Sequence, residues 1–390
     1  MAALSSPSFR RDRLTWLTYF SISAYAFYVY ALGPVVSLLR TELHLSYTLA
    51  SLHSTLWAVG AVATGLGFDV LSRRLGRRLL LWLSALVTAV GAVLFTLAHE
   101  VALTLPATAI LAVGSSTLGA VSSTLIADQH GGQRDHALLE ANAGASGTGI
   151  AVPALLGLLA GTAAGWRPGL LLPVVTLAAL FAVYRRLPLP APVAPAASAR
   201  RLPRSFWPAC LLVAFAVAIE FAILFYGVPL LGAGSGIPTD RAAAILSVFL
   251  VGELSGRLAG ARLTRRSGRG ETVVAVSLVL TLAGFLVLWL GRTAPLQGVA
   301  LYATGAGVGN LYPISLALAF RASQGLNDRA MARTQVAIAI AIGTAPVLLG
   351  ALSDRFGVLR ALAVEPALIV GAAVLLFVVR GRPAGGTVPP

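Results

Sequence analysis

Apolar stretches about twenty residues long succeed one another along almost the whole chain, with short turns between them. A helix needs about 20 apolar residues to cross a bilayer, where every backbone polar group must be bonded internally. Only 11% of the 390 residues are charged, whereas a soluble domain has about 25%. The sequence therefore predicts an all-α membrane protein. Twelve spans are predicted, at about 14–39, 47–68, 79–98, 102–127, 137–161, 168–185, 206–231, 240–261, 272–291, 295–320, 332–352 and 359–379.

The positions of the arginines predict the orientation of the chain. All 29 basic residues are arginines; with the N-terminus inside, 22 fall on the inner side of the predicted spans, 6 on the outer side, and Arg257 lies within a span. Cytoplasmic loops carry the excess of basic residues in membrane proteins. Both termini are therefore predicted to be cytoplasmic, and the first span is expected to be an uncleaved anchor. A multi-pass protein of the plasma membrane, the inner membrane of a bacterium, is expected.

Several classes of function are disfavoured. The net charge of +15 is distributed over short turns and forms no basic face with interleaved aromatic residues, so no nucleic-acid partner is expected. Cys210 is the only cysteine and the five histidines form no ligand pair, so no metal or cofactor is expected. The predicted spans contain no nucleophile with a His/Asp set, and there is no P-loop, which argues against an enzyme. A monomer is predicted, with the lipid bilayer as its surroundings.

The two halves of the chain resemble each other. The run from Arg73 to Arg78, RRLGRR, is nearly repeated 192 residues later by the run from Arg265 to Arg269, RRSGR. Three pairs of identical residues are 193 positions apart: Asp135 and Asp328, Pro153 and Pro346, Arg167 and Arg360. Between the halves, a Pro/Ala-rich segment cannot continue a helix. The prediction is two pseudo-symmetric six-helix bundles, 1–186 and 206–390, joined by a cytoplasmic linker, 187–205.

These features resemble the major facilitator superfamily over nearly the whole chain. The resemblance rests on twelve spans, a six-plus-six duplication, a long middle linker, and Arg-Arg-x-Gly-Arg after the second and eighth spans. It implies a secondary transporter with a central cavity, working by rocking-type alternating access.

The family's turn pattern is similar to Gly-x-x-x-Asp-Arg-x-Gly-Arg-Arg. In this chain Arg73 stands at the acidic position of the pattern, and Asp69 stands one helical turn earlier, at the glycine position. The remaining positions match. The predicted cytoplasmic gate comprises Asp69, Arg73, Arg74, Gly76, Arg77, Arg78, Asp135, Arg265, Arg266 and Asp328.

Glu220 is the first candidate for transport chemistry, because it lies near the middle of the seventh predicted span. A carboxylate at mid-membrane costs about 2.5–3.5 kcal/mol on insertion scales, and a low-dielectric environment favours its protonated form. One interpretation is a proton-coupling carboxylate or an acceptor for substrate. The other is a protonated side chain bonded to a neighbouring helix.

Glu253 and Arg257 lie four residues apart in the eighth predicted span, in the order that favours an ion pair on a helix. They either satisfy each other, or Arg257 turns to a substrate anion or to Glu220 during transport. A mid-span acid followed by Gly-Arg in the next span is similar to sugar-permease-like members of the superfamily.

Aromatic and amide side chains extend the predicted substrate cavity. The tyrosines of the first span precede Gly33-Pro34, and Tyr226 precedes Pro229 in the seventh; such breaks in corresponding spans point to a binding region or its outer gate. Tyr30, near a span end, is assigned to the interfacial belt, and the belt and the cavity are both open for Tyr25 and Tyr28. For Asn310, cavity lining and a bond to a neighbouring helix are both open. The predicted cavity residues are Tyr25, Tyr28, Trp57, Tyr226, Glu253, Arg257, Asn310 and Gln335.

The sequence thus predicts a proton-coupled transporter of a small organic solute. A drug or lipid efflux antiporter is the first alternative, although the Gly-Pro pair of drug/proton antiporters is absent, since Val152 precedes Pro153. An uncoupled facilitator is the second, because one acid does not establish coupling.

Overall fold

The computed structural model describes residues 9–45, 47–190, 201–237, 239–265 and 268–381, and these residues form helices and no strand. The first group of helices is α1 (Arg13–Glu42), α2 (Tyr47–Leu97), α3 (Val101–His130), η1 (Gly131–Gln133), α4 (Arg134–Ala160), η2 (Arg167–Leu171) and α5 (Leu172–Tyr184). The second group is α6 (Phe206–Ser235), α7 (Thr239–Leu263), α8 (Gly270–Leu290), α9 (Ala294–Ala322), α10 (Asn327–Phe356), α11 (Val358–Ala361) and α12 (Val364–Arg380).

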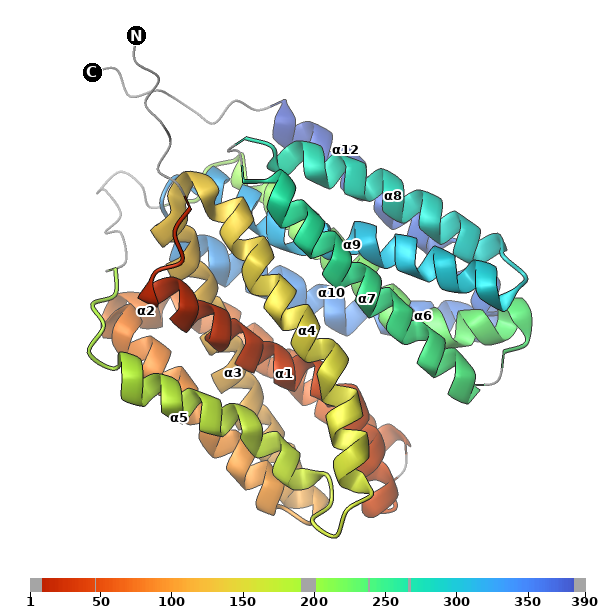
Figure 1. The fold of residues 1–390 in the computed structure, drawn as a ribbon, viewed down its shortest axis with the longest axis horizontal. Helices are drawn as coiled ribbons and strands as arrows, with labels where there is room; N and C mark the ends of the chain where they lie inside the picture. The colour runs from red at the N-terminus through yellow and green to blue at the C-terminus, as the bar shows by residue number, and fades with distance from the viewer. Residues whose placement is uncertain (1–8, 46, 191–200, 238, 266–267, 382–390) are drawn as a thin grey trace.

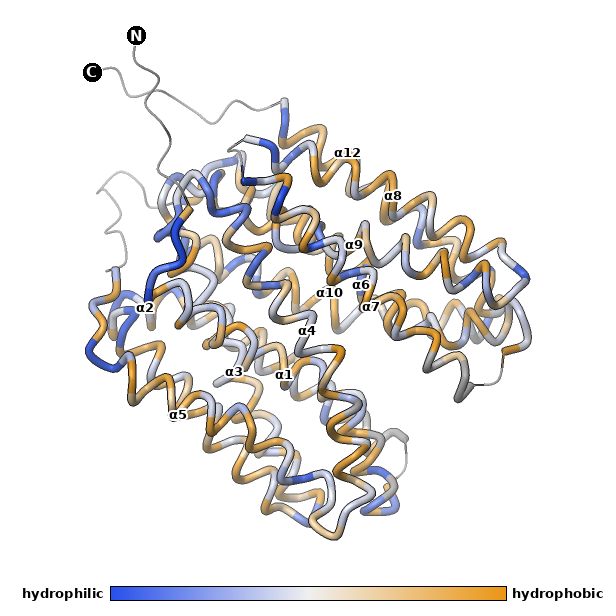
Figure 2. The backbone as a smooth tube through the Cα atoms, in the orientation of Figure 1, coloured by the Kyte–Doolittle hydropathy of each residue, from blue (hydrophilic) through white to orange (hydrophobic). Residues whose placement is uncertain are grey.

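The two groups of helices meet at one end of the molecule and diverge towards the other (Figure 1). The described residues nearest both termini lie at the end where the groups meet, which we call the terminal end. Contacts between the groups run mainly from α2 to α10 and from α4 to α7 and α9. Hydrophilic residues gather at the terminal end, whereas the shafts of the helices are mostly hydrophobic (Figure 2).

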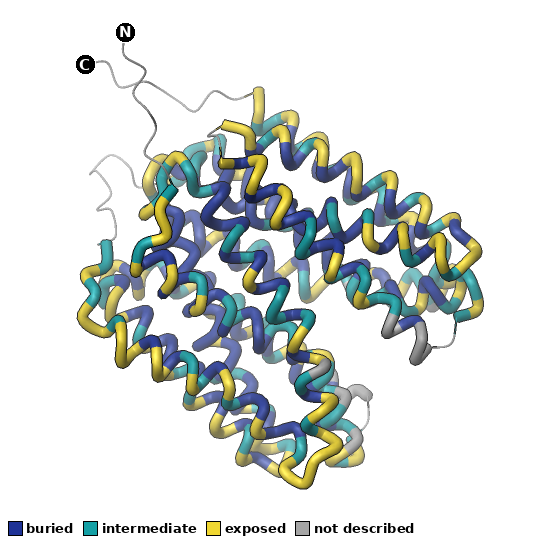
Figure 3. The backbone as a smooth tube through the Cα atoms, viewed as in Figure 1, coloured by how far each residue is buried: buried dark blue, intermediate teal, exposed yellow. Residues whose placement is uncertain are grey.

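Eight helical stretches among the described residues are long and apolar enough to cross a membrane. Two of them, Leu52–Leu97 and Val101–Ala160, have 46 and 60 residues, far more than the about 20 that one crossing needs. Large apolar side chains point outward along the shafts, as at Leu66 and Phe377, which are 63% and 77% exposed, and exposed positions alternate with buried ones on each helix (Figure 3). The chain is a multi-pass membrane protein.

The basic turn predicted over 69–78 is mostly helical, which corrects the prediction. Helix α2 runs through it and bends only at Gly76, whose φ of 73° and ψ of 155° interrupt the helical conformation. Positive φ of this kind favours glycine. Gly268, 192 residues later, has φ 89°, so both halves have a glycine of positive φ just before an arginine.

Helices α7 and α9 approach each other closely through glycines on both sides. A Cβ added at Gly256 of α7 would collide with the backbone of Ala306, and one added at Gly305 of α9 with the backbone carbonyl of Phe249. Small residues permit such packing between membrane helices. This contact fixes α7, which carries part of the central site.

We expect Gly305→Ala to destabilise the protein by about 1–3 kcal/mol, because the added methyl group overpacks the interface. Gly298 lies on the same helix with open space at its Cβ position, so Gly298→Ala is a matched control, with helix propensity in its favour. Thermal unfolding in detergent measures both variants. Equal melting temperatures would contradict the packing argument.

Candidate functional site

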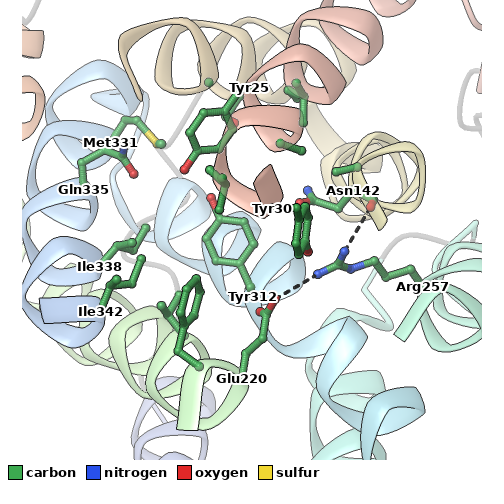
Figure 4. A pocket seen from close by; sticks show the side chains of 18 residues that line it. Tyr25, Tyr30, Asn142, Glu220, Arg257, Tyr312, Met331, Gln335, Ile338 and Ile342 are labelled. Carbon is green, nitrogen blue, oxygen red and sulfur yellow. Dashed lines mark hydrogen bonds and ion pairs between the residues drawn. The ribbon is translucent and has the colours of Figure 1, made fainter. Parts of the chain in front are cut away.

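A cavity of about 90 Å³ lies between the two groups of helices. Helices α1, α3 and α4 line it from one group, and α6, α7, α9 and α10 from the other. Figure 4 shows polar side chains converging on it from both sides. The volume is well below the about 300–1,000 Å³ of typical small-molecule pockets. A bound solute larger than a few water molecules therefore requires the groups to move apart.

The cavity wall contains a buried cluster of two carboxyl groups and one guanidinium group, which we call the Glu220–Glu253–Arg257 cluster. Their residues are 7%, 0% and 2% exposed. Nη2 of Arg257 contacts Oε1 of Glu253 and lies 3.9 Å from Oε1 of Glu220. The predicted pair of Glu253 with Arg257 is therefore present. Glu220 and Arg257 line the cavity, whereas Glu253, which was also predicted to line it, does not.

The guanidinium group of Arg257 also reaches the other group of helices. Its Nη1 donates to the backbone oxygen of Asn142, at 3.1 Å, and to the hydroxyl of Ser146, both on α4. Its Nε donates to the backbone oxygen of Gly309 on α9, at 3.0 Å. Arg257 thus connects acids of its own group to oxygens of the opposite group (Figure 4).

Tyrosine rings form much of the remaining wall. Tyr25 and Tyr30 come from α1 and Tyr312 from α9, and all three line the cavity. Tyr30 lies close to Arg257 (Figure 4), so its assignment to an interfacial belt is wrong. Gly149 of α4 leaves room for this ring, since a Cβ there would lie 2.8 Å from it. Gln335 adds the amide predicted from α10.

Besides Glu253, four predicted cavity residues are placed elsewhere. The hydroxyl of Tyr28 donates to the backbone oxygen of Leu170 at 3.0 Å, inside the first group of helices. Trp57 packs in the same core. The hydroxyl of Tyr226 lies beside Gly350 of α10, and Asn310 donates to Ser277 on α8 at 3.1 Å. None of these four side chains is among those that line the cavity.

Helix periodicity explains which residues of α1 face the cavity. The lining positions Ile22, Tyr25, Ala26 and Val29 follow the three- and four-residue spacing of one helix face. Tyr28 lies on the neighbouring face. The spacing was visible in the sequence, but only the packing of α1 shows which face meets the cavity.

At the terminal end, Arg77 joins the two groups of helices. Its side chain is 1% exposed, and it lies 2.5 Å from Asp128 of α3 and 2.8 Å from Asp328 of α10. The hydroxyl of Ser72 donates to Asp328 at 2.7 Å, and the amide of Asn327 donates to Asp128. Every polar atom of this network thus has a partner across or beside the junction.

Two further bridges cross the terminal end. Arg321 of α9 lies 2.9 Å from Asp135 of α4, and Arg329 of α10 lies 3.3 Å from Asp69 of α2. Asp69 also lies 2.6 Å from Arg73, one turn away on its own helix.

Among the residues that the structure describes, the other predicted gate residues form no ion pair between the two groups of helices. Arg74 and Arg265 are exposed, and Arg78 donates to the backbone oxygen of Arg185. Arg266 lies outside the described residues. Within the described part of the chain, no three His, Cys, Asp or Glu residues are placed to share a metal ion.

Comparison with known proteins gives one family. A family model described as Major Facilitator Superfamily matches residues 18–337, and no curated protein matches the chain significantly. The fold is similar to that of the transporter FucP in its outward conformation, with a TM-score of 0.74 and 17% identity over 95% of this chain and 100% of FucP.

Two other solved structures share the fold. The human organic anion transporter MFSD10 has a TM-score of 0.72 and 16% identity over 93% of this chain and 97% of that one. The proton:xylose symporter XylE has a TM-score of 0.76 and 13% identity over 93% and 94%. At these identities the likeness shows the fold.

Proposed function

This chain belongs to the Major Facilitator Superfamily of membrane transporters, and on that premise we propose that it couples the movement of a small polar organic solute to protons by alternating access. The solute binds in the cavity between the two groups of helices. The Glu220–Glu253–Arg257 cluster binds and releases the proton.

The charge of this cluster is the observation that carries the proposal. Two ionised carboxyl groups and one guanidinium group leave one net negative charge in the membrane interior, where a net charge is costly. One bound proton makes the cluster neutral. Glu220 borders the cavity and lies farther from Arg257 than Glu253 does, so Glu220 is the group that exchanges the proton.

The side chains of the cavity wall are suited to a neutral solute with several hydroxyl groups and a compact ring. The hydroxyls of Tyr25, Tyr30 and Tyr312 and the amide of Gln335 offer hydrogen bonds, and aromatic faces stack on a ring. XylE is a proton:xylose symporter and FucP of E. coli is a fucose:proton symporter. A monosaccharide or similar polyol is therefore the first class to test.

An amphipathic efflux substrate is the second candidate. Ile338 and Ile342 of α10, Phe221 of α6 and Val29 of α1 give the cavity an apolar side. Drug susceptibility of cells with and without the gene separates this candidate from sugar uptake.

The proposed topology has twelve spans in two six-helix halves, 1–186 and 206–390, with linker 187–205 and both termini in the cytoplasm of a bacterium. In this topology α2 forms two spans that join at Gly76, and α7 and α9 each form a span that contains polar residues. The matching breaks at Gly76 and Gly268, and the arginine-rich terminal end, support it. The terminal-end bridges then form a closed cytoplasmic gate, and the structure is an outward-facing or occluded state.

We expect Arg77→Gln to open this gate. Breaking a buried ion pair costs about 3–5 kcal/mol, so the ratio of gate-open to gate-closed molecules should rise at least about tenfold, equivalent to about 1.4 kcal/mol. Spin labels at Arg74→Cys and Arg265→Cys, in a Cys210→Ser background, report the distance across the gate.

Arg73→Gln is the matched control for Arg77→Gln. Arg73 is 37% exposed and pairs with Asp69 on its own helix, where an ion pair contributes about 0.3–0.5 kcal/mol. Its distance distribution should match that of the wild type. Identical distributions for both variants would show that Arg77 does not hold the gate.

Uptake into proteoliposomes tests the proposed function itself. Labelled monosaccharides, polyols, amino acids and organic anions are offered with and without an inward proton gradient. Accumulation of one class that follows the gradient supports the proposal. Gradient-independent equilibration would indicate a facilitator, and proton-driven export of hydrophobic drugs would indicate the efflux alternative.

A further inference from the structure

A second cluster of titratable side chains lies at the terminal end, apart from the central cavity. His136, in the first turn of α4, is its centre and is 2% exposed. Its Nδ1 lies 2.5 Å from the backbone oxygen of Ala261 on α7. Its Nε2 lies 3.2 Å from Oε1 of Glu140, one turn along α4. The imidazole therefore contacts both groups of helices.

The two partners of His136 are both hydrogen-bond acceptors. A backbone carbonyl can only accept, so Nδ1 must carry the hydrogen that is shared with Ala261. An ionised carboxylate also only accepts, so a hydrogen bond to Glu140 requires a hydrogen on Nε2. A neutral imidazole carries one of these hydrogens and an imidazolium carries both. The protonated ring is the form that satisfies both contacts.

The surroundings of Glu140 keep it as a carboxylate acceptor. Arg11 donates to it through Nη2 at 2.6 Å and Nε at 2.9 Å, and the Tyr19 hydroxyl donates at 2.8 Å. A carboxylate with three donated hydrogen bonds is strongly held in its charged form. Arg11 precedes α1 and Tyr19 lies on it, so this carboxylate is fixed by the first group of helices alone.

The remaining groups near His136 are part of the same half. The ring of Phe9 packs edge-on against His136 at 4.3 Å, and also lies 4.6 Å from the ring of His130. His130 bonds to the Thr15 hydroxyl at 2.8 Å.

Asp12 is the nearby acid of the segment before α1. Burial raises the pKa of its carboxyl group, but hydrogen bonds from Thr15 and Gln129 together lower it by more. The net shift of the pKa is therefore downward. Asp12 therefore remains ionised through the range in which histidines titrate. From α7, the group that faces the ring is the carbonyl of Ala261.

We propose that His136 is a proton-binding site, separate from the Glu220–Glu253–Arg257 cluster, and that its protonated form holds the terminal end closed. When the groups of helices separate at this end, the ring loses the carbonyl of Ala261. The closed state consequently binds this proton more tightly than the open state. On the proposed function, acid on the side of the termini slows transport by keeping that gate shut.

The sign of the pH dependence follows from this linkage. A proton held more tightly in the closed state stabilises that state at low pH, and the stabilisation disappears as pH rises. One proton changes the ratio of open to closed molecules by at most about tenfold per pH unit.

The test measures the distance across the gate without solute, using the spin labels at Arg74→Cys and Arg265→Cys. The Cys210→Ser and Glu220→Gln background removes the other thiol and the titration of the central cluster. From about pH 5.5 to pH 8, the open fraction should rise when His136 is present. In His136→Gln it should be nearly independent of pH, because glutamine can donate to Ala261 but does not titrate.

His130→Gln is the matched control, since His130 bonds within the first group of helices and should leave the pH dependence in place. Glu140→Gln provides a second variant, which should move the midpoint to lower pH by weakening proton binding. An unchanged pH dependence in His136→Gln, or its loss in His130→Gln, would overturn the proposal. If the gate responds to pH but no solute is taken up, the proton-binding role of His136 stands and the proposed function is refuted.

Discussion

Replacing Glu220 by glutamine should abolish proton-driven accumulation of solute while exchange of solute continues. Glutamine preserves the size and hydrogen bonds of the side chain but cannot ionise. With a gradient of one pH unit, a carrier that moves one proton per solute can sustain about tenfold accumulation. In Glu220→Gln the solute should only equilibrate. Uptake and counterflow of labelled solute in proteoliposomes measure the two activities.

Glu365→Gln is the matched control for this experiment. Glu365 is also buried in a membrane helix, at the start of α12, but it does not line the cavity. Accumulation should persist in that variant. If Glu220→Gln accumulates solute as the wild type does, Glu220 has no part in coupling.

Replacing Arg257 by methionine should have the largest effect on stability. Glu220 and Glu253 would lose their cation, and an uncompensated buried charge costs about 3–5 kcal/mol. The hydrogen bonds to Asn142 and Ser146 on the opposite group would be lost as well. We expect a lower melting temperature and little folded protein in the membrane.

Adding Glu253→Gln to Arg257→Met should restore part of the lost stability, because it removes one of the stranded carboxylates. Measuring Glu253→Gln alone as well completes a double-mutant cycle, which isolates the coupling between the two residues. Arg380→Met is the control, since Arg380 and its partner Glu271 are 40% and 33% exposed and exposed ion pairs contribute about 0–1 kcal/mol. A melting temperature of Arg257→Met equal to that of Arg380→Met would show that the cluster does not stabilise the fold.

Much of the central site could be predicted because charges are rare in apolar spans. Glu220, Glu253 and Arg257 are conspicuous against their neighbours, and the four-residue spacing of the last two predicts their contact. The bonds from Arg257 to Asn142 and Ser146 join residues more than a hundred positions apart. No local pattern encodes such a contact, since it depends on how the two groups of helices pack.

The roles of the tyrosines likewise depend on packing that the sequence does not reveal. Tyr25 and Tyr28 are both tyrosines in one apolar span, and the sequence gives no reason to separate them. Packing places Tyr25 in the cavity wall and Tyr28 in a hydrogen bond to Leu170. The position of Tyr30 late in the span predicts an interfacial side chain, yet the space beside Gly149 accommodates its ring in the cavity wall.

Most helices are longer than the predicted spans, which rest on apolar residues alone, whereas α5 and α12 are shorter. Helix α10 begins at Asn327 and ends at Phe356, whereas the predicted span was 332–352. Polar residues extend helices beyond the hydrocarbon region, because the backbone bonds continue there at little cost. Helix α2 is the extreme case, since its helical conformation persists through the basic turn up to Gly76.

The position of Arg257 between two sets of acceptors has a consequence for energetic efficiency. Its own half offers carboxylates, and the opposite half offers the neutral oxygens of Asn142 and Ser146. On the proposed function, a proton on one carboxylate weakens the attraction between Arg257 and its own half. The hydrogen bonds of Arg257 to the opposite half then become relatively more favourable, so proton binding and contact between the halves are coupled. We expect such a carrier to show little leak, since crossing with the wrong occupancy would strand a charge in lipid.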